Sequence, residues 1–495
     1  MDYITLFKEK QIESNEHYPR HDIGVARLFY DLHSQHICYV VESKAWYTYG
    51  GKRWSKDEGN LRIMEMCKAF AQTYAKYAEY FDDGSEENKQ FIKYAQGLTS
   101  RRRRESILSD ARSIHPVSLS RFDRGKTLFN CQNGTFCLTT MRLLPHNPKD
   151  YITKLAKVEY DSAAKCERWE KFIDEIMCCN SSGDVGGGSN DDIRKNRETA
   201  RFLQKALGYA LSGETALECF FILYGNKTRN GKSTLSETVA FIMGEYARTI
   251  QPQTLSRRPA DGGAASPDTA RLKGARLVNV PEPEKGLELN IALVKQLTGG
   301  DTYTTRFLNE NPVEFTPEFK IFINTNHLPS TSDDTVFLSG RVKLIPFDRH
   351  FQPHEQDSSL KKHFRKPRNK SGILNWLIEG YGLLQAEGLP LPEKVENAIQ
   401  VYRQEADIIG SFLLECTAKQ DDRRTTAAEI YAAYTLWAKD NGYRQMNNKN
   451  FVSELRRRLD VRRGSAGNIV VGVVLDYGEN PFVEKDGVHY PKCLR

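Results

Sequence analysis

Residues 219–243 read CFFILYGNKTRNGKSTLSETVAFIM, and this stretch decides the fold expected of the chain. The opening run, 219–224, is short and apolar, as is typical of a buried parallel strand. The closing run, 234–243, has helical spacing. The segment between them follows the pattern G-x4-G-K-S. A strand, a phosphate-cradling loop and a helix are therefore expected in that order.

The loop carries the residue types that phosphate binding requires. Its glycines let the backbone curl so that N–H groups surround the phosphates, and the helix behind it adds a positive N-terminal end. Lys232 would neutralise the β- and γ-phosphates of ATP, and the Ser233 hydroxyl would ligate Mg²⁺. The residues expected to contact the nucleotide are Gly225, Asn226, Lys227, Thr228, Arg229, Asn230, Gly231, Lys232, Ser233 and Thr234.

Hydrolysis also needs an acidic group on the metal side of the site. The strand-like run 276–280 leads into the sequence PEPE, which places Glu282 and Glu284 just past the end of a strand. Open α/β sheets carry their chemistry at that edge. One of the two carboxylates would hold Mg²⁺ through water, with Glu282 the expected metal-side group, or would polarise the attacking water. The sequence leaves open which glutamate activates water.

Two further polar residues accompany later strand-like runs. The run 319–326 ends at Asn326, which is placed to sense the γ-phosphate and position water. Arg341 directly precedes the apolar run 342–345. This arginine is either structural or an arginine finger that enters a neighbouring subunit, and a finger of that kind implies a ring or filament.

Composition sets the broad class of the protein. A chain of 495 residues exceeds what one hydrophobic core usually organises, so several domains are expected. No apolar run approaches the roughly 20 residues needed to cross a bilayer, and the first residues do not resemble a secretory signal. We therefore expect a location in a bacterial or host cytoplasm. The net charge of +7 suits a polyanionic partner, and the cysteine spacings predict no zinc site.

The pattern of periodic segments predicts further elements around the phosphate loop. Hairpins are expected at 46–54 and 128–144, and helices at 59–82 and 86–113. A glycine- and serine-rich stretch at 180–190 predicts a flexible loop. The tail is expected to form helices at 408–417, 426–441 and 448–459, followed by a strand at 468–475. Three helices with a terminal β-ribbon outline a winged helix-turn-helix.

The expected fold class is α/β and multidomain. Five regions are predicted, and they are an amino-terminal α/β domain at 1–160, a helical collar-like segment at 161–212, a phosphate-loop core at 213–350, a helical connector at 351–404 and a winged-helix DNA-binding domain at 405–495.

These pieces together resemble the superfamily 3 helicases, specifically the helicase part of phage and plasmid primase–helicases and the related poxvirus nucleoside triphosphatase. The motifs that carry the resemblance are NGKSTL (230–235), LKGARLV…PEPE (272–284), LVKQLTGGDTYTTRFL (293–308), FKIFINTNHLP (319–329) and GRVKLIPF (340–347). The resemblance implies a hexameric AAA+-like motor that uses ATP to translocate on single-stranded DNA during replication of a phage, plasmid or other mobile element. Lys232, Glu282, Glu284, Asn326 and Arg341 match its catalytic positions.

The sequence departs from the family pattern at two places. The family often has a pair of basic residues where this chain has Arg341 alone. The family's DNA-translocating hairpin would turn here at Asn309–Asn311, without a basic residue at the tip. Arg306 and Lys320 on its flanks are the expected substitutes for that DNA contact.

Two other functions remain open from the sequence. A replication initiator or loader would read origin duplex through the tail, where the basic residues near the expected recognition helix are Lys449, Arg456, Arg457 and Arg458. A non-motor nucleotide switch or defence ATPase would explain the absent basic hairpin tip. No polymerising primase domain is recognisable, so a separate primase is a possible partner.

Overall fold

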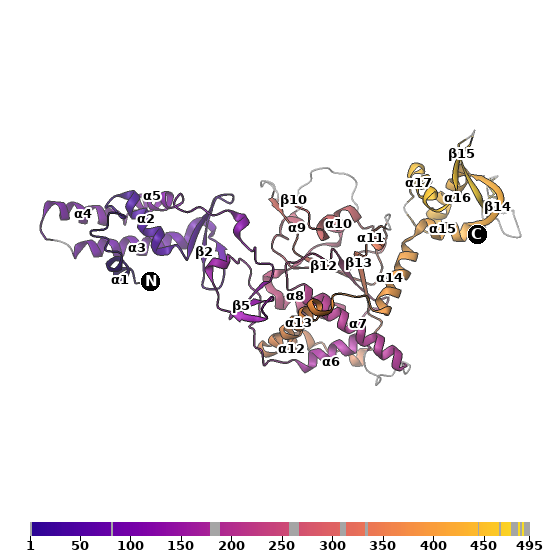
Figure 1. Cartoon of the computed structure of the whole chain (residues 1–495), viewed down its shortest axis with the longest axis horizontal. Helices are drawn as coiled ribbons and strands as arrows, with labels where there is room; N and C mark the ends of the chain where they lie inside the picture. The colour runs from indigo at the N-terminus through magenta and orange to yellow at the C-terminus, as the bar shows by residue number, and fades with distance from the viewer. Residues whose placement is uncertain are drawn as a thin grey trace.

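The chain is arranged as an amino-terminal part, a central body and a carboxyl-terminal part along one long axis (Figure 1). The computed structural model describes residues 2–80, 83–178, 189–256, 267–306, 313–331, 335–443, 445–464 and 467–476, with short strands at 484–485 and 488–489. The predicted turn at 309–311 and most of the predicted loop at 180–190 lie outside the described residues.

The amino-terminal part is a helical bundle beside a small antiparallel sheet, β1-β2-β3. Its elements are α1 (Tyr3–Glu9), α2 (Asp22–His33), β1 (Ile37–Val40), β2 (Ala45–Tyr49), β3 (Trp54–Lys56), α3 (Leu61–Glu79), α4 (Glu86–Gly97) and α5 (Arg101–Ala111). The predicted hairpin at 46–54 is confirmed by the pairing of Tyr49 with Trp54. The prediction of a single helix at 86–113 is wrong, because α4 ends at Gly97. The extended backbone of Ser100 then caps a second helix, α5, which begins at Arg101.

A second antiparallel sheet joins this part to the central body. It contains β4 (Leu128–Cys131), β5 (Gly134–Cys137) and β6 (Arg142–Leu144). The predicted hairpin at 128–144 is confirmed by the pairing of Cys131 with Gly134, and β6 adds a third strand by pairing with β5.

The central body is built on a parallel five-stranded sheet in the order β13-β7-β12-β9-β8. Its strands are β7 (Phe220–Tyr224), β8 (Ala247–Thr249), β9 (Leu277–Val280), β12 (Lys320–Thr325) and β13 (Val342–Pro346). All residues of β9 and β12 are buried, including the polar side chains of Asn279 and Asn324 within them. A separate pair, β10 (Tyr303–Thr305) and β11 (Val313–Phe315), forms an antiparallel ribbon ahead of β12.

Helices cover this sheet on both sides (Figure 1). They are α6 (Glu167–Ile176), α7 (Asn190–Tyr209), α8 (Lys232–Met243), α9 (Pro267–Ala270), α10 (Ile291–Thr298), α11 (Thr335–Leu338), α12 (Leu360–Phe364), α13 (Pro367–Glu387) and α14 (Glu393–Ala406). Buried side chains from Phe129 to Tyr402 form one continuous core. The division into five regions stays a prediction.

The carboxyl-terminal part has its own core, which includes Phe412, Trp437 and Phe451. Its elements are α15 (Ile408–Cys416), β14 (Thr417–Thr426), α16 (Ala427–Asp440), α17 (Asn448–Arg458), β15 (Val461–Gly464), β16 (Gly467–Leu475), β17 (Glu484–Lys485) and β18 (Val488–His489). The three predicted helices and the strand at 468–475 are present. Strand β14 was not predicted from the sequence, because most of its side chains are polar and exposed.

Within the described residues, no helix combines the length and the apolar character that crossing a bilayer requires.

Candidate nucleotide site

Three neighbouring parallel strands deliver the predicted site residues to one edge of the central sheet. Strand β12 lies between β7 and β9, with Thr325 paired to Tyr224 and Ile323 paired to Val280. Gly225, Asn326 and Glu282 follow the carboxyl ends of these three strands. Open α/β sheets place ligand chemistry at that edge, so the register itself assembles the candidate site.

The loop at 225–231 is tightly closed on itself. A Cβ atom on Gly225 would lie 2.3 Å from Asn230 Nδ2 and 2.6 Å from the Phe347 carbonyl oxygen. Asn230, which is buried, donates its side-chain N–H to the Lys227 carbonyl at 2.8 Å. Gly231 has a φ of +87°, and a Cβ there would meet Ile176 of α6 at 2.4 Å. Glycine suits both positions, because neighbouring atoms occupy the place of a Cβ at each and Gly231 also has a left-handed backbone conformation.

Lys232, the first residue of α8, turns its ammonium group toward the strand ends. Its Nζ donates to Asn326 Oδ1 at 2.6 Å and to the Gly225 carbonyl at 3.4 Å. Burial lowers the pKa of Lys232 to about 8, while the charge of Glu282 opposes that shift. A buried cation whose hydrogen-bond partners among the described residues are neutral oxygens suits an anionic ligand, and the closed loop of backbone beside it suits phosphate.

The oxygen groups expected to hold Mg²⁺ lie at the same edge. Ser233 is exposed on the first turn of α8, and Glu282 is exposed with its Oε1 accepting the Asn326 N–H at 3.3 Å. Glu284 is exposed two residues further along. Hydroxyl and carboxylate oxygens are the ligands that Mg²⁺ prefers, and it commonly keeps several waters. The residues present therefore fit a nucleotide with its metal.

A buried polar network near the loop was not predicted from the sequence. Asn324 of β12 donates to Asn279 Oδ1 of β9 at 2.7 Å and accepts from Ser236 Oγ of α8 at 3.2 Å. All three residues are buried. The network ties two strands to the helix that carries Lys232, which fixes the angle of α8. Asparagines inside the runs 276–280 and 319–326 were the available signal, since a polar residue in a buried strand needs a partner.

A second support comes from the segment after β13. The His350 ring Nδ1 lies 2.7 Å from the Thr228 carbonyl, so an Nδ1–H donates there. Phe351 N–H donates to the Arg229 carbonyl at 2.8 Å, and Arg229 Nη1 donates to Gln356 Oε1 at 3.0 Å. These residues follow a strand of the same sheet, so their position past a carboxyl end was the signal that could have found them.

Arg341 lies at the opposite end of the sheet, just before β13. It is held by contacts within the chain, since its Nη2 pairs with Glu218 Oε2 at 2.5 Å and its Nη1 donates to Thr298 Oγ1 at 3.0 Å. Glu218 adopts a left-handed backbone conformation with a φ of +43°. The structure does not bring Arg341 to the edge of the sheet that carries Gly225, Asn326 and Glu282, which is called the nucleotide edge below.

Lys320 does not fit the predicted DNA contact. Its side chain is buried, its Nζ donates to the Ser212 carbonyl at 2.6 Å, and it lies 4.1 Å from the centre of the Tyr209 ring. Burial lowers its pKa well below the usual range. The prediction is wrong because Lys320 opens a fully buried strand and points into the body. Arg306 is exposed at the end of β10, directly before residues outside the described set.

The predicted basic residues of the tail lie on and near α17. Lys449, Arg456 and Arg457 are exposed. Arg457 and Arg458 both pair with Glu454, and Arg458 also pairs with Asp407 at 3.0 Å. Arg456 donates to Asn468 Oδ1 at 3.0 Å. Part of this cationic charge is therefore neutralised within the chain.

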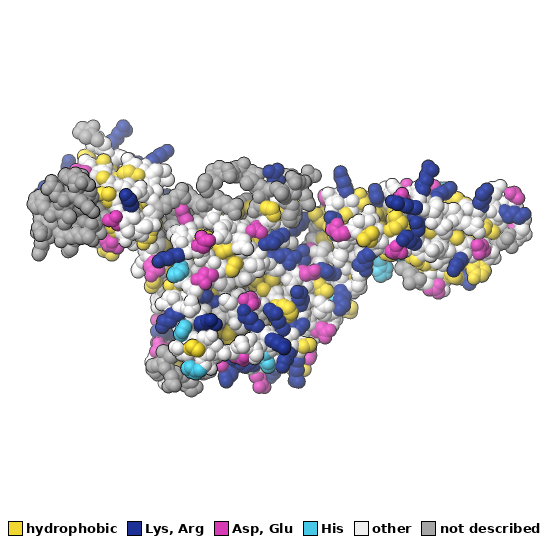
Figure 2. Space-filling view, turned by 180° about the vertical axis from the view of Figure 1, so that it is seen from behind, with side chains coloured by type: hydrophobic (Ala, Val, Ile, Leu, Met, Phe, Trp, Pro, Cys, Tyr) yellow, Lys and Arg dark blue, Asp and Glu magenta, His cyan; other side chains and the backbone are white. Residues whose placement is uncertain are grey.

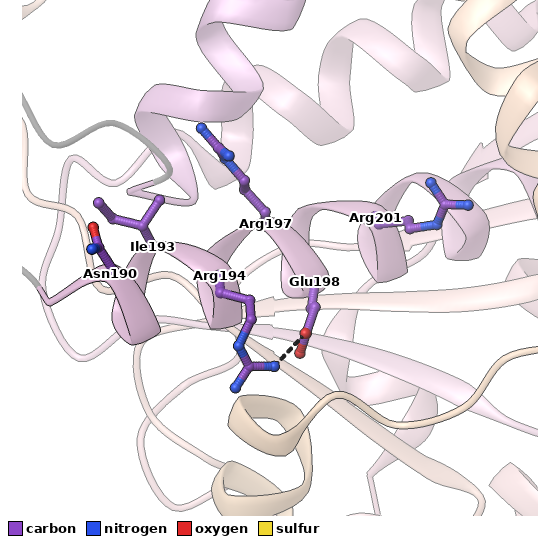
Figure 3. Close-up of a pocket in the computed structure, with 6 residues that line it drawn as sticks. All are labelled: Asn190, Ile193, Arg194, Arg197, Glu198 and Arg201. Carbon is purple, nitrogen blue, oxygen red and sulfur yellow. Dashed lines mark hydrogen bonds and ion pairs between the residues drawn. The ribbon is translucent and has the colours of Figure 1, made fainter.

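A hollow on α7 shares no residue with the nucleotide edge. Arg194, Arg197 and Arg201 project there from successive turns of the helix, and Arg194 pairs with Glu198 at 2.6 Å (Figure 3). Arg201 also pairs with Glu387 of α13. One helix supplies the whole lining, so the hollow is a surface feature of α7.

Comparison with known proteins shows similarity to two family models and to several viral proteins. Residues 26–178 match the family described as D5 N terminal like, and residues 223–341 match a family of unknown function, DUF5906. The chain is 23% identical to "Putative helicase L207/L206" of Acanthamoeba polyphaga mimivirus over 82% of its own length and 44% of that protein. It is also 23% identical to "Putative helicase 121R" of Invertebrate iridescent virus 3, over 89% of this chain and 52% of that protein.

The chain spans about half the length of these two relatives. Among solved structures, the apo structure of the NrS-1 C-terminal region is 12% identical and covers 91% of this chain and 99% of that chain, with a TM-score of 0.46. The amino-terminal region is thus similar to the D5 N terminal like family, and the chain is similar to viral proteins that are named putative helicases.

Proposed function

We propose that the protein is an ATP-dependent DNA helicase or translocase that acts in replication of a phage, plasmid, virus or other mobile element. ATP with Mg²⁺ is its expected cofactor, single-stranded DNA its track, and a ring of identical subunits, most simply a hexamer, its working form. Its expected compartment is the cytoplasm of a bacterial or other host cell, with a separate primase as a possible partner.

The observation that carries this proposal is the hydrogen-bonded chain from Lys232 through Asn326 to Glu282. Lys232 Nζ contacts Asn326 Oδ1 at 2.6 Å, and the Asn326 N–H contacts Glu282 Oε1 at 3.3 Å. A cation for phosphate, an amide that can report the γ-phosphate and a carboxylate for water or metal thus form one connected set. Phosphoryl transfer is catalysed by this combination of positioning and charge.

Each residue has a distinct part in the proposed reaction. Lys232 would exchange its bond to Asn326 for one to phosphate, which frees the Asn326 amide to orient water. Glu282 or Glu284 would accept a hydrogen bond from that water, and Ser233 would ligate the metal. Bound Mg²⁺ would supply neutralisation of the charge that develops on the phosphate oxygens.

The proposed ring rests on Arg341. Arg341 lies at the opposite end of the sheet from Gly225, Asn326 and Glu282, with its side chain 16% exposed. A neighbouring subunit would complete the site once Arg341 leaves Glu218. A finger supplied in trans couples hydrolysis to assembly.

The carboxyl-terminal part supports a second candidate, an initiator or loader that reads origin duplex. Helix α17 lies beside the ribbon β15-β16, and exposed Lys449 and Arg456 lie on this helix. We propose that this part is a winged helix with α17 as its recognition helix. One protein can serve both as initiator and as motor.

Unwinding of a forked DNA duplex tests the proposal. Strand separation should require ATP and a single-stranded tail, and Lys232→Ala and Glu282→Gln should abolish it while leaving the fold unchanged by circular dichroism. Protein that hydrolyses ATP at a rate indifferent to DNA and never separates the fork would leave the non-motor switch as the better account.

A further inference from the structure

Two segments far apart in the sequence, Lys157 and the stretch 361–370, bring seven lysine and arginine side chains to one face of the central body. This surface, named here the α12 patch, consists of Lys157, Lys361, Lys362, Arg365, Lys366, Arg368 and Lys370. No aspartate or glutamate occurs between 358 and 378. Lys and Arg side chains are prominent over the central body seen from behind (Figure 2).

Packing explains why these cations face outward. Leu360 and Phe364 are the buried side of α12, and Phe364 packs against Trp169 and Phe172 of α6 at 5.1 and 5.5 Å between ring centres. Several residues between and beyond these two anchors therefore face solvent. Lys362, Arg365, Lys366 and Arg368 are accordingly exposed.

Contacts between the segments fix the patch as one surface. Arg365 of α12 and Lys157 lie over the same ring, Phe241 of α8, at 4.6 and 5.4 Å from its centre. Lys370 Nζ donates to the Lys157 carbonyl at 2.6 Å. Lys361 pairs with Glu237 of α8 at 2.7 Å. The cations therefore sit beside the helix that begins with Lys232.

The charge of the patch is largely uncompensated. Among the residues that the structure describes, Lys361 alone of the seven pairs with a carboxylate. A solvated basic face usually interleaves acids with its cations, as α7 does with Arg194, Asp191 and Glu198. Like charges held together by packing cost free energy unless a polyanion relieves them.

We propose that the α12 patch binds the phosphate backbone of duplex DNA without reading its sequence. Single strands are usually held by exposed aromatic rings on which bases stack, but Phe241 in this patch is covered by Arg365 and Lys157. Contacts to phosphate alone favour duplex, which has the higher charge density. This inference rests on the proposed function for one point, the choice of DNA as the polyanion that binds the patch.

A triple substitution tests the patch. Lys362→Gln, Lys366→Gln and Arg368→Gln remove three exposed charges and leave the contacts of Arg365, Lys361 and Lys370 in place. Fluorescence anisotropy with a labelled blunt duplex and the same labelled single strand, from 50 to 300 mM salt, gives the affinity and its salt dependence. The matched control, Lys76→Gln with Lys89→Gln and Lys93→Gln, removes three exposed charges from α3 and α4.

The triple variant should bind duplex at least tenfold more weakly at the lowest salt. The slope of log affinity against log salt should become shallower by about 2 to 3, since each lost phosphate contact removes about 0.9. Single-strand affinity and the control should change less than twofold. Unchanged duplex binding or an equal loss on single strands would each overturn the proposal.

The same preparations separate this inference from the proposed function. ATP hydrolysis and fork unwinding by the unsubstituted chain report on the motor, whereas duplex anisotropy reports on the patch. A chain that never unwinds DNA but loses duplex affinity in the triple variant would retain the patch and reject the motor. An active helicase whose triple variant binds duplex normally would do the reverse.

Discussion

At the scale of single residues, the proposed nucleotide site depends most on the protonation state of Lys232. Burial holds its pKa near 8 in the folded chain, against 10.5 for an exposed lysine. The unfolded chain therefore binds more protons than the folded chain between these two values, so this residue makes folding more favourable as pH rises through that window. An anionic ligand reverses the shift by stabilising the cation.

Nucleotide binding should consequently take up a proton at high pH. Above about pH 8 the apparent affinity should fall by up to about tenfold per unit, because the ammonium form must be regenerated. Calorimetry at pH 9 in two buffers of different ionisation enthalpy should give uptake approaching about one proton per nucleotide, and close to none at pH 7. Lys232→Arg is the control, since an arginine stays charged throughout. Buffer-independent heats at pH 9 for the unsubstituted chain would contradict the assignment of Lys232.

Arg341 is the other residue whose role can be separated by experiment. Subunits carrying Arg341→Ala keep their own nucleotide edge, and subunits carrying Lys232→Ala keep their arginine. Each variant alone should lose most hydrolysis, by about a thousandfold for the arginine. An equal mixture should regain activity at about a quarter of its sites, because that fraction pairs an intact edge with an intact neighbour. Activity equal to the sum of the two inactive variants would show that Arg341 acts only within its own subunit, through Glu218 and Thr298.

At the scale of elements, the strand–loop–helix unit around residues 219–243 was predictable because each part has a local signature. Strand β7 is an apolar run, the loop is glycine-bounded and α8 has helical spacing. The position of Lys320 was not predictable from the sequence. It follows from the pairing of β12 with β9 and from the contact of the buried Lys320 Nζ with the Ser212 carbonyl. The Asn324–Asn279 bond likewise depends on strand order, which no local pattern encodes.

The edge strand β14 illustrates a different limit. Its side chains are mostly polar and exposed, and it exists because its backbone pairs with β16. Local hydrophobic alternation, the main sequence signal for a strand, is weak there.

The loop itself makes a prediction at this scale. Gly225→Ala places a Cβ within 2.6 Å of both Asn230 Nδ2 and the Phe347 carbonyl, so the loop must shift. Nucleotide affinity should fall at least tenfold, with a loss of about 1 to 3 kcal/mol in the free energy of unfolding. Gly300→Ala is the matched control, since a Cβ there meets nothing within 4 Å. Equal nucleotide affinities for the two variants, by titration calorimetry, would show that the loop does not hold the phosphates.

At the scale of the whole molecule, the three parts divide the proposed work. The central body holds the nucleotide edge and the α12 patch, while α14 leads from the body to the carboxyl-terminal part with its basic α17 (Figure 1). The overall α/β class and the order of its regions follow from the spacing of periodic segments along the chain. The surfaces proposed to meet a neighbouring subunit or DNA cannot be predicted in this way, because they are formed by side chains that share no local sequence pattern.

The central claim is that the edge formed by Lys232, Asn326 and Glu282 hydrolyses ATP in response to DNA. Steady-state ATP hydrolysis, measured with and without an unstructured single strand, tests it most directly. The account predicts a clear rise in rate with single-stranded DNA, and a loss of about a hundredfold or more in Lys232→Ala under both conditions. A rate unaffected by DNA, or hydrolysis that survives in Lys232→Ala, would contradict the claim.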